Sequence, residues 1–221
     1  MNGMPSYFSL IVVSALLAVV PFLVVAATSF AKISVVLFLV RNALGVQQTP
    51  PGILLNTIAI VLTLFIMAPV LREIYGIVTD PRHLFTSLQD YERVATEAIQ
   101  PLKRFLSNHV RPEATEFFLE TTRKIWDGRQ GAPVDAKADD IFILIPSFLV
   151  SELTRAFEIG FLLYLPFLVV DFVISIILVA MGMSMLSPTV ISTPFKLLLF
   201  IFIDGWSRLL QGLVLSYVPG A

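Results

Sequence analysis

The residues of this sequence best suited to chemistry are isolated charges within apolar stretches. Eight ionisable side chains lie inside or beside long apolar runs, four cationic and four anionic: Lys32, Glu152, Arg155, Glu158, Asp171, Lys196, Asp204 and Arg208. If all of them faced lipid, the cost would be on the order of 20–28 kcal/mol, more than the stability of a typical domain. We therefore expect them to pair with opposite charges, to line water, or to lie in helices outside the lipid.

The spacing of these charges favours contacts between helices or between subunits. Glu152 and Arg155 are three residues apart, so a pair within one helix is the simpler interpretation for these two. Asp171, Lys196 and Asp204 each stand alone in an apolar run. Reaching water from a helix end suits long cationic side chains and is difficult for a short Asp. We expect Glu152, Asp171 and Lys196 to pair across an interface, and both interpretations stay open for Asp204.

A methionine-rich turn is the second chemically suggestive feature. Residues 180–188 read AMGMSMLSP, in which methionines alternate with small residues: Met181, Gly182, Met183, Ser184 and Met185. In a loop, which Gly and Pro favour, all three thioethers could project to one side, whereas a helix would spread them. Flexible, polarizable Met side chains repack around irregular shapes, so a ring of them could seal a pore around a passing chain. Filling of a hydrophobic core is the plainer alternative, which the sequence leaves open.

Other reactive groups are scarce, which argues against several classes of enzyme. The chain has no Cys, and its two histidines are His83 and His109. Neither has a partner at the HExxH spacing of a helical zinc site, and no phosphate-binding GxxxxGKS/T loop is present. The net charge of −1 gives no electrostatic basis for binding nucleic acid. We therefore expect a protein that is not an enzyme and that holds no cofactor and no metal.

The elements that must position these residues are helices, most of them too apolar for water. Hydrophobic residues make up 57% of the 221 residues, and most of the charged ones fall between Arg72 and Asp140. The first apolar run, Tyr7 to Val40, would be about 51 Å long as one helix, beyond the roughly 30 Å of a bilayer core. We expect an uncleaved helix here, kinked at Pro21, rather than a signal peptide, because no Lys or Arg precedes it.

The polar middle of the chain has the spacing of short helices. Apolar residues recur at steps of three and four from Leu84 to Phe105, as on one helical face. Pro101 should split this stretch into two helices. Pro112 should begin another helix, in which Glu120 and Lys124 pair across one turn.

These patterns predict an all-α protein made of membrane-associated hydrophobic helical hairpins and a small helical extramembrane middle module. The N-terminal hairpin spans residues 1–71, the polar module 72–140, and the C-terminal hairpin with the methionine turn 141–221. An uncharged helix from Ile53 to Leu71 would be long enough to cross a bilayer.

Four stretches together carry a family resemblance: KISVVLFLVRNALGVQQTPP (32–51), LTLFIMAPV (62–70), FLVSELTRAFEIGFLLYLPFLVVDFVISIILVAMGMSMLSP (148–188) and ISTPFKLLLFIFIDGW (191–206). In order and spacing they resemble the FliP/SctR family, the major subunit of the export gate in bacterial flagella and type III secretion injectisomes. The turn MSMLSPTVIST and the absence of a basic start are more similar to the injectisome branch than to the flagellar one.

The resemblance implies a pore subunit that passes unfolded proteins across the bacterial inner membrane. Five copies would assemble with small and related export-apparatus membrane subunits, largely at the periplasmic side of the membrane within the basal body. Membrane lipid and secreted chains in transit would be further partners, and the middle module would face the periplasm.

Particular residues receive roles from the same resemblance. The methionine turn would form a gasket that narrows the central passage. Glu152, Asp171 and Lys196 match the interface charges of the family, and a Glu152–Lys196 bridge between neighbouring copies is the pairing that we expect. The alternative function is an ion channel or secondary transporter that relays ions through its intramembrane charges.

Overall fold

The computed structural model describes residues 7–46, 48–82, 88–126, 136–183 and 185–218, and every regular element within them is a helix. The helices are α1 (Tyr7–Ala26), α2 (Phe30–Ala43), α3 (Gly52–Val78), α4 (Leu88–Ala98), α5 (Gln100–His109), α6 (Pro112–Trp126), α7 (Ile141–Ala180), α8 (Pro188–Phe202) and α9 (Gly205–Leu215). The predicted all-α fold class is therefore confirmed.

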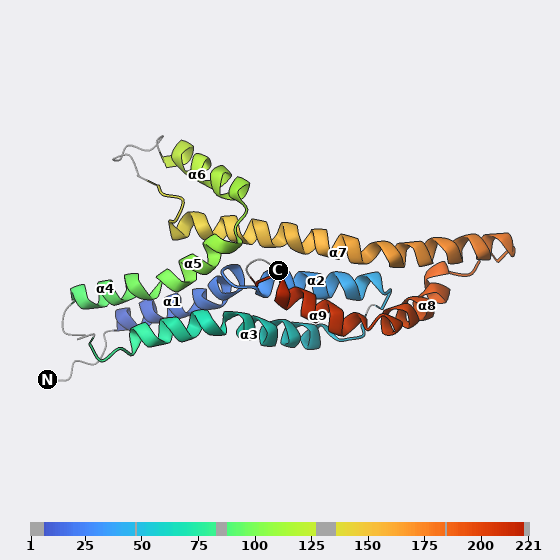
Figure 1. Ribbon diagram of the computed structural model, residues 1–221, viewed down its shortest axis with the longest axis horizontal. Coiled ribbons are helices and arrows are strands. Elements are labelled where there is room, and N and C mark those ends of the chain that lie inside the picture. Colours follow the sequence, from blue (N-terminus) through green and yellow to red (C-terminus); the bar gives the residue numbers. More distant parts are fainter. Residues whose placement is uncertain (1–6, 47, 83–87, 127–135, 184, 219–221) are drawn as a thin grey trace.

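Helix α7 forms the long axis of an elongated molecule (Figure 1). It runs for 40 residues without a break, which is about 60 Å at the rise of an α-helix. Helices α2 and α8 pack along it, α3 packs on α2, and α6 packs against the first part of α7 (Figure 1). The end of α7 and the start of α8 extend beyond α2 and α3, so these two helices form a projecting tip.

The first apolar run folds as two helices rather than as one kinked helix. The chain bends by 64° between α1 and α2, whereas Pro21 lies inside α1, so the predicted position of the kink is wrong. At the bend, the Thr28 hydroxyl donates to the Val24 carbonyl at 2.6 Å and accepts from the Phe30 amide at 3.4 Å. Such local side-chain bonds compete with the helical backbone ladder. The bend turns the start of α2, with Lys32, into the protein core.

The prolines of the polar middle act as predicted. Helix α4 ends at Ala98 and Pro101 lies in the first turn of α5, while Pro112 begins α6. Lys124 and Glu120 form the expected pair at 3.6 Å. Leu84, with which the predicted apolar face begins, and His83 lie outside the described residues.

Two hydrophobic clusters hold the helices together. One lies among α2, α3, α7, α8 and α9. The other joins α3, α5, α7 and Tyr217, which follows α9, and it contains Phe105 and Leu106 of α5 together with Phe148. Helix α5 of the polar middle therefore packs directly on the apolar helices.

Several helices have the length and composition of membrane spans. Among the described residues, α3 and α7 each suffice to cross a bilayer, and the bent pairs α1–α2 and α8–α9 bring the number to four if each pair is one span. Large apolar side chains such as Phe22, Phe65 and Phe161 are exposed on the single chain. Apolar surface of this extent needs lipid or another protein to cover it.

Candidate functional site: the methionine turn and two ionic clusters

The methionine turn lies at the projecting tip, where α7 gives way to α8 (Figure 1). Gly182 has a φ of +73°, a left-handed conformation that Gly adopts without steric cost. The Gly182 amide donates to the Val179 carbonyl at 3.0 Å, and the Met183 amide donates to the Leu178 carbonyl at 2.9 Å. These two bonds are the Schellman arrangement that ends a helix. The Met-Gly-Met sequence therefore ends α7 itself.

The methionine side chains of this turn point away from the protein core. The exposed fractions are 64% for Met181, 44% for Met183 and 99% for Met185. Ser184, the remaining position of the predicted gate, lies outside the described residues. Core filling within the single chain therefore does not explain these residues. The role of Met181, Gly182, Met183, Ser184 and Met185 as a gate stays a prediction.

A distal ionic cluster lies below the tip, between α7 and α8. The Lys196 ammonium donates to the Asp171 carboxylate at 2.5 Å and to the Ala43 carbonyl at 3.2 Å. The Ser192 hydroxyl donates to the other Asp171 oxygen at 2.5 Å. Ala43 is the last residue of α2, and the free carbonyls at a helix C-terminus attract cations. Lys196 thus ties the α7–α8 hairpin to the end of α2.

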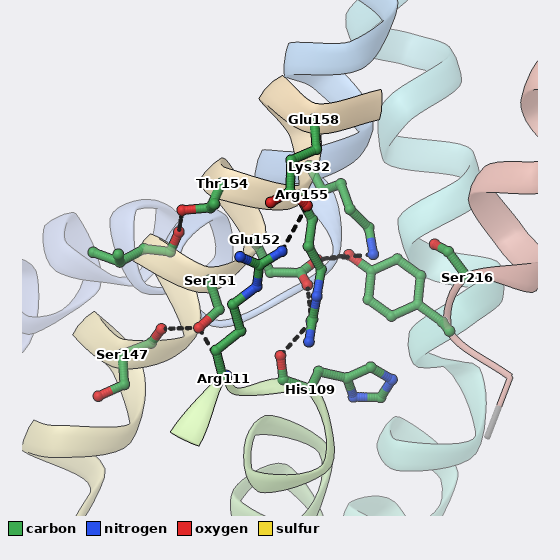
Figure 2. A network of polar contacts seen from close by, with 12 residues as sticks. Lys32, His109, Arg111, Ser147, Ser151, Glu152, Thr154, Arg155, Glu158 and Ser216 are labelled. Carbon is green, nitrogen blue, oxygen red and sulfur yellow. Dashed lines mark hydrogen bonds and ion pairs between the residues drawn. The ribbon is translucent and has the colours of Figure 1, made fainter. Parts of the chain in front are cut away.

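A proximal ionic cluster surrounds Glu152 on α7. Figure 2 shows Glu152 between the side chains of Lys32 and Arg155. The Lys32 ammonium lies 3.2 Å from Glu152 Oε2, and the Arg155 guanidinium donates to Glu152 Oε1 at 3.0 Å. The Tyr217 hydroxyl also donates to Glu152 Oε2. Lys32 and Glu152 have exposed fractions of 1% and 0%, so this is an ion pair within the core.

Tyr217 closes this cluster from the C-terminal end of the chain. Its ring lies 3.6 Å from the Lys32 ammonium, in cation–π geometry, and stacks on Phe105 with centroids 6.0 Å apart. Burial and the adjacent Glu152 carboxylate raise the pKa of the Tyr217 phenol. The phenol therefore stays a neutral hydrogen-bond donor to Glu152.

Further polar contacts join the proximal cluster to the connection between α5 and α6 (Figure 2). The Arg155 guanidinium donates to the His109 carbonyl at 2.5 Å. The Arg111 amide donates to the Ser151 hydroxyl at 3.0 Å, and its guanidinium pairs with Glu158 at 2.6 Å. This side of α7 therefore fixes the polar middle of the chain to the apolar helices.

The structure gives Glu152 and Lys196 partners other than each other. The Glu152–Arg155 pair within one helix, the simpler interpretation of their spacing, is present at 3.0 Å. Lys196, however, pairs with Asp171, which lies about 28 Å farther along α7 than Glu152 at 1.5 Å per residue. A Glu152–Lys196 bridge between copies would have to break both of these buried arrangements. The structure thus offers no support for that bridge.

Asp204 and Arg208 are not brought into either cluster. Asp204 has a φ of +53°, is exposed, and accepts a hydrogen bond from the Ser207 hydroxyl at 2.9 Å. It marks the break between α8 and α9, which are bent by 61°.

Sequence reasoning missed Tyr217 and Ser192 as members of the clusters. A Tyr within an apolar run is a usable signal, because a buried phenol needs a hydrogen-bond partner. Ser192 stands four residues before Lys196 and so shares its helical face. Within the described ranges, no group of three or more His, Asp or Glu side chains could hold a metal ion.

Comparison with known proteins supports the family resemblance. The model of the FliP family matches residues 13–213. The chain is 53% identical to the probable translocation protein y4yL of Sinorhizobium fredii, an alignment that covers 98% of this chain and 97% of that protein. It is 47% identical to Yop proteins translocation protein R of Yersinia pestis (98% and 99% covered) and 39% identical to surface presentation of antigens protein SpaP of Salmonella typhi (95% and 96% covered). The family model and these matches, which cover nearly the whole chain, lead to one assignment, that the chain belongs to the FliP family.

Proposed function

We propose that this protein is a membrane-embedded export-gate subunit of a type III secretion system of the injectisome kind, a pore component rather than an enzyme. The family match and the relatives named as translocation or secretion proteins support this assignment. The single observation that carries the gate role is the turn of three exposed methionines at a projecting tip.

The geometry suggests how the turn would act. Copies arranged around an axis would bring their tips together, and the flexible Met side chains would close the opening and deform around a passing chain. The Gly182 helix end fixes the backbone of each turn. The Asp171–Lys196 cluster ties the hairpin to α2 below it. The backbone is therefore held while the thioethers remain free to move.

Assembly would occur through the apolar surface that the single chain leaves exposed. Phe172, Phe195 and Phe202 of the α7–α8 hairpin are examples. We propose about five copies per gate, with small and related export-apparatus subunits beside them, located largely at the periplasmic side of the inner membrane. Asp204, which is exposed, keeps its proposed role as an interface charge. Glu152, Asp171 and Lys196 would support the interface by holding the helices that form it.

Replacement of Met181, Met183 and Met185 by Ala tests the gate. Gates assembled with their membrane partners should become more permeable to small molecules, because Ala cannot span the opening. A matched control replaces three exposed apolar residues of α3, namely Leu54, Val61 and Leu64, and should leave the leak unchanged. If the methionine variant assembles and leaks no more than the wild type, the gate role is wrong.

The ionic clusters also weigh against the ion-channel alternative. Glu152, Asp171 and Lys196 are already engaged with opposite charges of the same chain, so they offer no vacant ligands to a passing ion. Ion flux through the purified chain alone, without its partners, would favour the channel instead.

A further inference from the structure

An apolar cavity between α7, α8 and α9 lies outside both ionic clusters. It measures about 360 Å³, which is within the range of small-molecule sites, roughly 300–1,000 Å³. The walls come from α7, α8 and α9, with α2 behind them: Leu163, Phe167, Phe200, Leu209, Leu213 and Val40. None of the charged residues of the two clusters is among its lining residues.

The cavity results from the bend between α8 and α9. Gly205, the first residue of α9, lies so close to the Phe200 ring that any side chain would collide with it. Gly212, two turns later, has the opposite surroundings, since an added Cβ would meet no atom within 4 Å. One close contact and one open position on the same face of α9 leave a wedge-shaped space beside α7.

Arg208 supplies the single charge among the described residues that line this cavity. It is exposed and forms no ion pair with any residue that the structure describes. Asp204, one turn earlier, accepts its hydrogen bond from Ser207 instead. A guanidinium at the edge of an apolar cavity, with no anionic partner among the described residues, is suited to pair with an anion from outside the chain.

We propose that the cavity binds an acyl chain of an anionic phospholipid, whose phosphate pairs with the Arg208 guanidinium. The walls suit a hydrocarbon chain, and guanidinium groups bind phosphate through two parallel hydrogen bonds. The Arg208 guanidinium favours an anionic occupant over an uncharged apolar helix, because beside such a helix it would be left without an opposite charge. The membrane around the protein supplies such lipids directly.

Lipid binding by the purified full-length protein in mild detergent tests the proposal. Spin-labelled phosphatidylglycerol and phosphatidylcholine serve as probes, and the immobilised fraction is measured. We expect tighter binding of phosphatidylglycerol. Arg208→Gln should weaken that binding by about fivefold, the effect of one cation near an anionic lipid, and leave phosphatidylcholine unchanged. Gly212→Leu should weaken both lipids by about tenfold, because it fills the space for the chain.

Two matched variants control for charge and for bulk. Arg123→Gln removes an exposed cation from α6, and Gly76→Leu adds a side chain at another glycine with open surroundings. Both should bind the two lipids as the wild type does. Equal binding of the two lipids, or an Arg208→Gln variant that folds and binds normally, would overturn the proposal. So would a photo-cross-linker at Gly212 that labels polypeptide instead of lipid in the assembled gate.

Discussion

Replacing Glu152 by Gln should destabilise this protein more than replacing its partner Lys32 by Met. One carboxylate serves two cations, with Lys32 Nζ at 3.2 Å and Arg155 Nη1 at 3.0 Å. Glu152→Gln removes the anion and leaves the Lys32 ammonium buried beside a second positive charge. Breaking a buried pair in this way costs about 3–5 kcal/mol of unfolding free energy.

Lys32→Met leaves a different balance of charges. The Glu152 carboxylate keeps the Arg155 guanidinium and the Tyr217 hydroxyl as donors. The loss should not exceed about 1.5–3 kcal/mol, the value of a hydrogen bond to a charged group. The loss of stability in Lys32→Met is reduced further, because a Met side chain, unlike an ammonium, loses no favourable hydration when it is buried. The order of the two variants, with Glu152→Gln the less stable, follows from this asymmetry.

Equilibrium unfolding of the full-length chain in mild detergent, followed by circular dichroism, measures these differences. A difference of 2 kcal/mol between the unfolding free energies of the two variants changes the unfolding equilibrium constant by about 30-fold. Glu158→Gln is the matched control on the same helix, because its partner Arg111 lies at 2.6 Å but its side chain is 54% exposed. Exposed pairs contribute about 1 kcal/mol or less. The reasoning is refuted if Lys32→Met proves the more damaging variant, or if Glu152→Gln behaves like Glu158→Gln.

Two glycine substitutions follow from the backbone and from helix packing. Gly182→Ala should destabilise the tip by about 1–2 kcal/mol, because a side chain is strained at positive φ. The small-molecule leak of assembled gates should therefore rise. An unchanged leak would show that the geometry of the turn is unimportant for the gate. Gly160→Ala should lower the melting temperature, because its new Cβ would crowd Leu39 of α2, whose Cβ lies at 3.2 Å. The control Gly76→Ala adds a side chain in open space and should stabilise the folded protein by up to about 1 kcal/mol. A similar gain in stability for Gly160→Ala would contradict the predicted contact with Leu39.

Predictions from the sequence were most successful where the cause is local. Pro101 and Pro112 begin helices because a ring that lacks an amide proton fits the first turn. Gly182 ends α7 because it alone of nearby residues takes positive φ without strain. The position of the first bend was missed, since Pro21 is accommodated within α1 and the bend falls at Thr28, whose hydroxyl bonds the Val24 carbonyl.

The partners of the buried charges were not predictable in the same way. Helices α2 and α7 are apolar on most faces, so neither shows a stripe that would indicate which side meets the other. The family resemblance suggested that Glu152 pairs with Lys196 of a neighbouring copy, but within the chain both residues have other partners. The backbone carbonyl of Ala43, which Lys196 contacts, gave no signal in the sequence.

The sequence by itself determined the helical class, the membrane character, the family and the methionine turn. Each of these follows from composition, run length or short motifs, in which the interacting groups are neighbours in the chain. Tertiary structure alone decided that Lys196 reaches a carbonyl 153 residues away and that Tyr217 donates to a carboxylate 65 residues away. Such contacts depend on how the helices are aligned, and that alignment is set by the packing of many apolar side chains at once.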